Sequence, residues 1–413
     1  MKFDVLIVGG GMVGATLAAT LGREGLGVAV VEAKETPPLP EHDLDVRVSA
    51  ITRASQHVFE SVGVWDALPA DRLQAFREMV VWDNPGVGEV HFDSADIAEP
   101  ALGHIVENVL IQHALNMRLE ALDTVEVFRP ARLDSLTVEA SRAIAEVDGV
   151  RISAALVVGA DGTGSRIRAL AGIEANAAAY GQHAVVATVT TAKHHRETAW
   201  QRFLPGGPLA FLPLPKGKVS VVWSTGPAHA RALQRMTPEG FGSALEAAFD
   251  GRLGAVTSVG ERATFELVSL HAREYVRERV ALVGDAAHTV HPLAGQGVNL
   301  GILDAAALSE VLAAARDRGR DIGRLLTLRK YERWRKGHNA LMRQTLSGFN
   351  WLFGNSFTPL RGVRNLGLGL TDRITPLKRL FMAHASGLAG DLPEAKKGLD
   401  VMFERSGARV RKD

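Results

Sequence analysis

The sequence predicts an α/β protein in which a mostly antiparallel β domain interrupts a βαβ-type domain, with a helical region at the C-terminal end. The first observation is an apolar strand at 4–8, a helical stretch at 12–23 and a second apolar strand at 28–31. The second is the return of apolar runs at 155–158 and 280–283, which lead into Gly-x-Asp and Gly-Asp turns. The third is a set of short strand-like segments between these pieces.

The short segments define the inserted β domain. Two of them, at 79–82 and 89–92, flank Asn84-Pro85-Gly86 and predict a hairpin. Similar signals recur at 185–189, 209–214 and 219–224. We therefore expect a discontinuous nucleotide-binding-type domain at 1–74, 100–178 and 266–345, a β domain at 75–99 and 179–265, and a helical C-terminal region at 346–413. A long helix is expected at 299–316.

The composition is that of an ordinary globular protein with two or three domains. The chain has 413 residues, of which 46% are apolar and 23% are charged, and a chain of this length can bury a large core. It contains no cysteine, which excludes disulfide scaffolds, thiolate metal sites and cysteine nucleophiles. The net charge of +1, from 47 basic and 46 acidic residues, argues against a general nucleic-acid-binding protein.

Neither a secretory signal nor a transmembrane helix is expected. The apolar run at 5–8 is too short for a signal peptide and leads directly into glycines. We find no stretch of about 18 predominantly apolar, uncharged residues. The absence of cysteine is compatible with a cytoplasmic location.

The last part of the chain is basic and carries apolar clusters. Residues 341–413 include 12 basic and 6 acidic side chains, whereas the first 340 residues include 35 and 40. A basic helix with an apolar face can lie on an anionic membrane surface. The alternative is a helical subdomain packed on the body, and the two interpretations are compatible.

The first strand and helix are joined by a glycine fingerprint. Gly9, Gly11 and Gly14 form G-x-G-x-x-G, which allows a tight turn, close approach of a pyrophosphate and close packing of the helix on the strand. Glu32 ends the second strand, where its carboxylate can accept a hydrogen bond from a ribose hydroxyl. This Rossmann-like unit predicts dinucleotide binding, but by itself does not distinguish NAD from FAD.

Two later motifs favour FAD. One lies at 159–168 and the other at 284–304, and the latter contains His-Pro-Leu-Ala-Gly-Gln-Gly-x-Asn-x-Gly-x-x-Asp. Together with the glycine fingerprint they resemble the three motifs of the single-component flavoprotein aromatic hydroxylases, which have the p-hydroxybenzoate hydroxylase-like fold. The closer resemblance is to the ubiquinone-biosynthesis hydroxylase family. It extends from residue 1 to about 395 and includes segments at 47–51, 103–108, 180–182, 205–210 and 331–335.

The resemblance implies a set of FAD-binding residues. Asp285 is expected to contact the ribityl chain, and the helix beginning near Val298 is expected to stabilise the anionic reduced flavin through its N-terminal dipole. Three side chains have structural alternatives: Arg47 near the pyrophosphate and flavin, Gln112 facing FAD, and Asp161, which either fixes a helix start or binds ribose. The predicted cofactor residues are Gly9, Gly11, Gly14, Glu32, Arg47, Gln112, Asp161, Asp285, Gly295, Gly297, Val298 and Asn299.

The reaction site is expected at the flavin-side turn, which contains Pro292, Leu293 and Gly295. We expect a substrate pocket between this turn and the β domain, lined by Phe211, Leu212, Pro213 and Trp223. No acid–base residue is evident. Some relatives deprotonate their phenol through tyrosines, but none of the three tyrosines of this chain falls in a matching motif.

The resemblance implies hydroxylation of a polyprenyl phenol or quinol precursor in ubiquinone biosynthesis, through a flavin C4a-hydroperoxide. FAD and O₂ are then required, and electrons come from NADH, NADPH or a separate reductase. Expected partners are a lipophilic aromatic substrate, a membrane surface and other ubiquinone-biosynthesis proteins, with no nucleic acid; the oligomeric state stays open. Expected locations are the cytoplasm and the inner face of the membrane. Two alternatives remain: a related FAD enzyme acting on a soluble aromatic compound, and a non-catalytic FAD-binding scaffold.

Other chemistries receive no support. His288 and His291 lie three residues apart but have no nearby carboxylate constellation, so no metal site is predicted. His194 and His195 fall in a charged, turn-like segment. Neither G-x-S-x-G nor a phosphate-binding P-loop occurs, which leaves hydrolase and NTPase functions without a basis.

Overall fold

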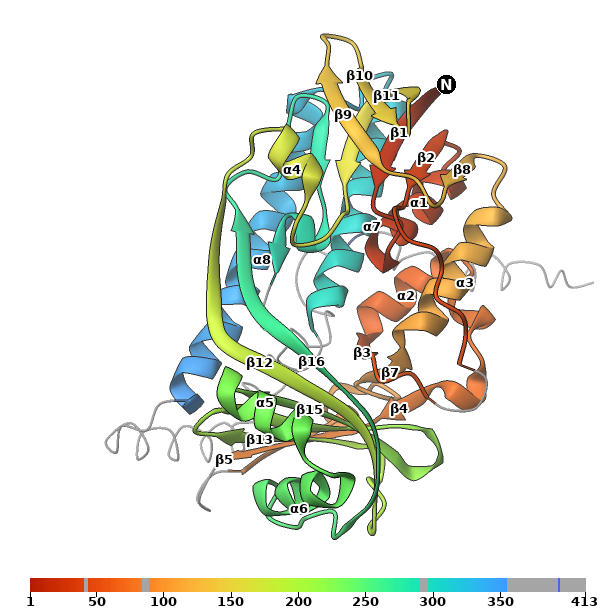
Figure 1. Ribbon diagram of the computed structural model, residues 1–413. Coiled ribbons are helices and arrows are strands. Elements are labelled where there is room, and N and C mark those ends of the chain that lie inside the picture. The colour runs from red at the N-terminus through yellow and green to blue at the C-terminus, as the bar shows by residue number, and fades with distance from the viewer. Residues whose placement is uncertain (41–43, 84–88, 290–295, 355–392, 394–413) are drawn as a thin grey trace, which may run out of the picture.

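A computed structural model describes residues 1–40, 44–83, 89–289, 296–354 and 393, with backbone only for 296 and 341–354. Within these residues the chain forms two eight-stranded sheets and one three-stranded sheet, with helices packed against them (Figure 1). The predicted α/β fold is confirmed, and the predicted domain boundaries stay a prediction.

The first sheet is built on the parallel strands expected from the apolar runs. Its order is β17-β18-β11-β1-β2-β8, and the pairs β18–β11, β11–β1, β1–β2 and β2–β8 are parallel. The hairpin β9–β10 continues from β11. The strands are β1 Lys2–Val8, β2 Val28–Val31, β8 Val125–Phe128, β9 Leu133–Val138, β10 Ala143–Val147, β11 Val150–Gly159, β17 Val276–Arg277 and β18 Val280–Leu282.

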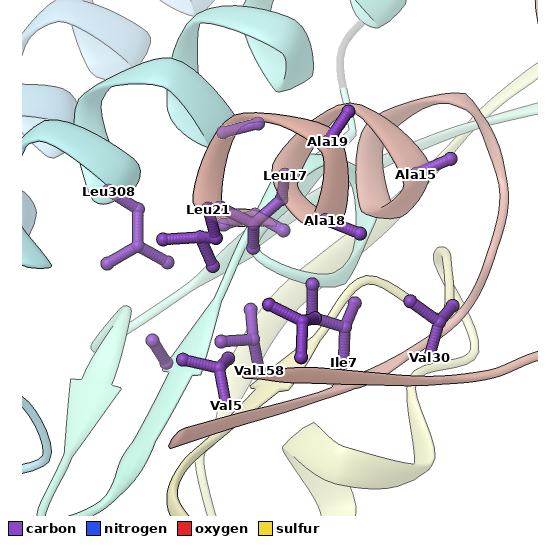
Figure 2. Packing of buried hydrophobic residues seen from close by; sticks show 14 of the residues in the cluster. Val5, Ile7, Ala15, Leu17, Ala18, Ala19, Leu21, Val30, Val158 and Leu308 are labelled. Carbon is purple, nitrogen blue, oxygen red and sulfur yellow. The ribbon is translucent and has the colours of Figure 1, made fainter. Parts of the chain in front are cut away.

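Helix α1 (Met12–Arg23) covers this sheet and has the predicted bounds. Its residues 14–22 are all buried, because the helix lies between the sheet and the helices α3 and α7. Figure 2 shows Leu17 and Leu21 packed toward Val5 and Ile7 of β1. Burial of each such leucine stabilises the fold by about 1.5–3 kcal/mol. The other helices are α2 Arg53–Ser61, α3 Asn108–Glu120, α4 Arg166–Leu170, α5 Pro227–Arg235, α6 Pro238–Ala248, α7 Gln296–Asp317 and α8 Leu325–Gly354.

Helix α7 contains the expected long helix and starts slightly earlier. Its segment 297–317 is long and apolar enough to cross a membrane by length and composition, contrary to the expectation from the sequence. However, 72% of the apolar window in that segment is buried inside the protein, and α7 packs against α1, α2, α8 and β3. We therefore interpret it as a core helix.

The second sheet confirms the inserted, mostly antiparallel β domain. Its order is β19-β16-β12-β15-β14-β13-β5-β6, with β13–β5 as a parallel pair. Two strands of 17 residues each, β12 and β16, pair with each other and run from the first sheet to the second (Figure 1). The strands are β5 Glu78–Asp83, β6 Glu89–Asp93, β12 Ala175–Thr191, β13 Thr198–Leu204, β14 Gly207–Pro213, β15 Lys218–Thr225, β16 Val256–Ala272 and β19 His288–Thr289. The expected hairpin is β5–β6, and its turn lies outside the described residues.

The two faces of the second sheet pack on different partners. Leu209 and Val221 face α5 and α6 in one apolar cluster. Leu212 and Val222 face the opposite way, toward the three-stranded sheet formed by β3 Val48–Thr52, β7 Gly103–Glu107 and β4 Gln74–Phe76. We call this second cluster the apolar layer; its buried members are Ala50, Ile105, Ala199, Leu212 and Leu214. Single-turn 3-10 helices, η1 Trp65–Ala67, η2 Ala70–Arg72, η3 Ser94–Ile97, η4 Pro215–Gly217 and η5 Gly284–Ala286, complete the fold.

Candidate cofactor and active site

Two glycines of the fingerprint are required by the protein itself. Gly9 has φ +104°, and a Cβ there would lie 2.3 Å from the carbonyl oxygen of Ala160. A Cβ at Gly14 would lie 1.9 Å from the carbonyl oxygen of Gly9. These contacts bring the first turn of α1 against the end of β1, as the motif predicts.

Gly11 is different, because none of the described residues requires a glycine there. It has φ −65° and ψ 178°, which any residue adopts, and forms the N-cap of α1 without a side-chain hydrogen bond. A Cβ at Gly11 would meet no atom within 4 Å. The free space lies at the N-terminus of a helix, where unpaired N–H groups and the helix dipole favour phosphate. The residues present therefore fit the pyrophosphate of a dinucleotide.

Glu32 and Gln112 both contact the middle of the glycine loop. The Glu32 Oε2 accepts a hydrogen bond from Gly10 N at 2.7 Å, and the Gln112 Nε2 donates to Gly10 O at 2.8 Å. Glu32 Oε1 also accepts from Lys34 N. Each residue thus positions the loop, and the remaining lone pairs of the Glu32 carboxylate leave acceptor capacity for a ribose hydroxyl.

Asp161 fixes the start of helix α4, which is one of the two roles considered for it. Its carboxylate accepts hydrogen bonds from Ser165 Oγ at 2.5 Å and from Arg166 N at 2.6 Å, at the start of α4. Arg168 of that helix then donates to Ala286 O at 2.9 Å, which links the second motif to the third. Binding of FAD ribose by Asp161 stays a prediction.

Arg47 lies on the surface in a loop whose backbone is anchored. Its carbonyl oxygen accepts from Asn108 N at 3.0 Å, and its guanidinium lies 5.3 Å from the ring centroid of Phe265 on β16. The buried carboxylate of Glu107 accepts from Asp45 N at 2.6 Å and pairs with Arg72. Two of the segments that carry the resemblance, 47–51 and 103–108, are therefore direct neighbours.

Asp285 presents a carboxylate that no described residue satisfies. It lies in η5, directly after β18, and none of the described residues hydrogen bonds to its side-chain oxygens. Desolvation by the surrounding protein raises the pKa of Asp285, against an opposing effect of His288, although the side chain is accessible to solvent. This arrangement fits a hydroxyl-rich ligand chain that hydrogen bonds to the carboxylate.

Among the described residues, Gly297 at the N-terminus of α7 has free space beside it. A Cβ there would meet none of their atoms within 4 Å, and the neighbouring Val298 is half-buried. Asn299 is buried, and its side chain accepts from Thr52 N at 3.0 Å and donates to Ala50 O at 2.7 Å. Its side chain therefore ties α7 to β3.

The structure brings the three motifs to one edge of the first sheet. Ala160 N donates to Val8 O at 2.7 Å, and Val283 N donates to Gly159 O at 3.0 Å, so the ends of three parallel strands are adjacent. A Cβ at Gly301 would lie 2.5 Å from a methyl of Val13, which packs α7 against α1. Ligands of open α/β sheets bind at this carboxyl edge. Pro292, Leu293 and Gly295 lie outside the described residues.

The four predicted pocket residues do not share one face of the second sheet. Phe211 and Trp223 pack in the cluster under α5 and α6, and Phe211 stacks on Phe249 with ring centroids 3.8 Å apart. Pro213 lies on the same face of β14 as Phe211, because alternate residues of a strand face the same side. Of the four, Leu212 alone lies in the apolar layer that faces the cofactor-binding domain.

Two of the three tyrosines are buried in the core. Tyr331 is fully buried and donates to Leu282 O at 2.8 Å, and burial raises its pKa well above its ordinary value. Tyr275 is fully buried as well. The buried network around Asp304 and His288 is not predicted from the sequence, because its members come from three separate segments.

Comparison with known proteins identifies the family. The chain matches the FAD binding domain family over residues 2–344. It is 40% identical to the ubiquinone hydroxylase UbiL of Rhodospirillum rubrum over 402 residues, covering 96% of this chain and 93% of that protein. It is 41% identical to the 3-demethoxyubiquinol 3-hydroxylase of Escherichia coli over 387 residues, covering 93% of this chain and 98% of that protein.

A solved structure shows the same fold. The p-nitrophenol 4-monooxygenase PnpA from Pseudomonas putida superposes with a TM-score of 0.76 at 20% identity, covering 94% of this chain and 99% of the other. These matches confirm the prediction of FAD over NAD and of the flavoprotein hydroxylase fold. The chain belongs to the family of FAD-dependent hydroxylases of ubiquinone biosynthesis.

Proposed function

We propose that this protein hydroxylates the aromatic ring of a polyprenyl phenol or quinol precursor of ubiquinone. The relatives named above are hydroxylases of ubiquinone or of demethoxyubiquinol. The observation that carries the proposal is the link from Asn299 to Ala50. Asn299 lies in the first turns of α7, and Ala50 belongs to the apolar layer. The flavin-side helix α7 is therefore bonded directly to a strand of the apolar layer, against which we expect the ring and prenyl chain to bind.

In the proposed hydroxylation, FAD would supply the reactive oxygen, and the protein would position the cofactor and the substrate. Bound FAD, once reduced and supplied with O₂, provides the electrophilic oxygen. The protein then has three tasks: α7 directs its N-terminal dipole at the flavin, Asp285 holds the ribityl chain, and the apolar layer around Leu212 excludes water. NADH, NADPH or a separate reductase supplies the electrons.

We also propose that the substrate is taken from a membrane on whose cytoplasmic face the protein lies. Helix α8, in which the basic part of the sequence begins, packs against β13 and β14 of the second sheet. A lipophilic substrate and a basic, apolar segment both favour an anionic surface. Flotation of the full chain should be stronger with vesicles containing anionic lipid than with neutral ones. Charge reversal at Lys396 and Lys397 should weaken it, whereas reversal at Arg142 should not.

Anaerobic reduction followed by product analysis tests the function. The purified protein should show a flavin spectrum that bleaches faster with NADH or NADPH when a prenylphenol is present. Under ¹⁸O₂ the product should carry one labelled oxygen. Equal turnover of a small soluble phenol and the prenylphenol would favour a soluble substrate. A flavin spectrum with no product from any precursor, even with added reductase, would contradict the proposal.

A further inference from the structure

A buried polar network lies behind the turn that carries Asp285. Its centre is the Asp304 carboxylate on α7, and the other members are His288, Arg335 and Asn339. Asp304 and Arg335 are fully buried, and the other two side chains are at most 2% exposed. The network joins the end of β18 to α7 and α8, which are distant in sequence.

Asp304 holds both ends of the segment 284–288. Its Oδ2 accepts a hydrogen bond from Gly284 N at 3.2 Å and another from His288 Nε2 at 2.5 Å. The ring of His288 is also stacked on Tyr275, with centroids 5.7 Å apart. Asp285 lies between the two anchored residues, and none of the described residues hydrogen bonds to its carboxylate. The conformation of Asp285 is thus set by groups that it does not itself contact.

The charge of Asp304 is compensated inside the protein. Its Oδ1 accepts from Arg335 Nε at 2.8 Å and from Asn339 Nδ2 at 3.0 Å. Burial alone would raise the pKa of Asp304, but the charges of His288 and Arg335 and two hydrogen bonds outweigh burial and lower it. Apolar side chains in place of this buried ion pair would stabilise the core equally well, so stability alone does not explain the carboxylate. The Asp304 carboxylate adds fixed hydrogen-bond acceptors that orient the turn 284–288.

We propose that Asp304 is a positioning residue that holds Asp285 in place for the ribityl chain of FAD. The proposal rests on the cofactor role of Asp285 within the proposed function. Asp304 lies behind the turn and is enclosed by protein, so it acts through Gly284 and His288 without touching the cofactor.

A double-mutant cycle on FAD affinity tests the coupling. In the otherwise unchanged protein, Asp285→Ala should weaken FAD binding by about tenfold or more, because a charge-assisted hydrogen bond is lost. In an Asp304→Asn background the same substitution should cost less than about threefold. The FAD dissociation constants are measured by flavin fluorescence quenching on refolded apoprotein. His288→Phe, which keeps a ring against Tyr275 but removes the donor, repeats the cycle if Asp304→Asn does not fold.

The matched control is the Arg279–Asp321 pair at the opposite end of β18. Arg279 is 1% exposed and its Nη2 lies 2.6 Å from Asp321 Oδ2. Asp321→Asn should lower thermal stability yet leave the full effect of Asp285→Ala. The proposal is overturned if the effect of Asp285→Ala is the same with and without Asp304→Asn, or if Asp321→Asn reduces that effect equally. Turnover of a prenylphenol by the unaltered protein tests the proposed function separately.

Discussion

Asn299 on α7 donates a hydrogen bond to the carbonyl oxygen of Ala50 on β3 at 2.7 Å, although 249 residues separate the two. The same side chain accepts from Thr52 N at 3.0 Å, at the N-cap of α2. One buried amide therefore fixes the relative position of the flavin-side helix and the apolar layer. An enzyme that hydroxylates a ring must hold that ring at a fixed position relative to the flavin. The position of α7 relative to the apolar layer therefore affects whether the reaction geometry is reached.

Replacement of the Asn299 side chain should lower the stability of the protein. Asn299→Ala leaves a backbone N–H and a carbonyl buried without partners, so we expect a loss of roughly 2–4 kcal/mol in the free energy of unfolding. Urea denaturation of the apoprotein measures it. Asn176→Ala, at an exposed position of β12, should change the same quantity by less than about 0.5 kcal/mol. Equal effects of the two substitutions would show that the link is not important for stability.

The glycine loop allows ligand binding and folding to be separated. Gly11→Ala should leave the apoprotein folded, with a loss of at most about 1 kcal/mol at the N-cap, because a Cβ there meets no atom of the described residues within 4 Å. It should weaken FAD binding by about 10–100-fold, the effect of an overpacked contact with the pyrophosphate. Gly14→Ala should instead prevent folding, since its Cβ would lie 1.9 Å from Gly9 O. Circular dichroism and flavin content distinguish the two, and full flavin retention by Gly11→Ala would contradict the pyrophosphate assignment.

Much of this edge of the sheet could be predicted from the sequence, because its determinants are local. The strand at 28–31 and the helix at 12–23 have the predicted bounds, since apolar runs and a glycine turn specify them within a few residues. The position of Asp285 directly after β18 was predictable for the same reason. Asn299 shows the limit: its place in the motif was predictable, but its bonds to β3 depend on the tertiary packing of α7.

The predicted pocket residues on β14 also show what the sequence alone does not determine. Period-2 alternation predicts that Phe211 and Leu212 face opposite sides, but which side faces the cofactor depends on where α5 and α6 pack. The network around Asp304 was missed for a related reason. Its bonds to His288 and Arg335 span 16 and 31 residues. The first depends on how α7 packs behind β19, and the second on how α8 packs on α7.

Two leucines on β14 test which face binds the substrate. Leu209 lies under α5 and α6, and Leu212 lies in the apolar layer. Truncation to alanine at either position should lower the free energy of unfolding by about 2–5 kcal/mol. Only Leu212→Ala should raise the KM for a prenylphenol, by about threefold or more, because a lost apolar contact of about 1 kcal/mol changes affinity to that extent. A higher KM for Leu209→Ala with no change for Leu212→Ala would place the substrate on the other face.

Asp285 should show opposite effects on apoprotein stability and on cofactor binding. Desolvation raises its pKa, so the ionised form is disfavoured in the folded apoprotein at neutral pH. Asp285→Asn removes that charge and should raise the melting temperature of the apoprotein at pH 7. The gain should shrink as the pH falls toward the raised pKa, where the natural carboxyl becomes protonated. FAD affinity should fall by about tenfold or more, because the charge-assisted hydrogen bond is lost. A parallel loss of both quantities would contradict this reasoning.

His104 makes the stability of the protein depend on pH. It lies on β7 beside Trp65, with ring centroids 5.1 Å apart, and its Nδ1 is buried without a partner among the described residues. Burial, together with the charge of Arg53, lowers the pKa of His104 to about 4. Between pH 6.5 and about 4 the unfolded chain therefore binds a proton that the folded protein does not, and stability is lost as the pH falls through this range.

The expected loss is roughly 2–3 kcal/mol between pH 6.5 and 4, after allowance for partial exposure of the ring. His104→Phe keeps an aromatic ring against Trp65 and cannot titrate, so its unfolding free energy should fall less steeply over this range. Urea denaturation at half-unit pH intervals measures both curves. Above about pH 7 the residue is neutral in both states, and the two curves should run parallel there. If they also run parallel between pH 4 and 6.5, His104 is not the group that destabilises the protein in acid.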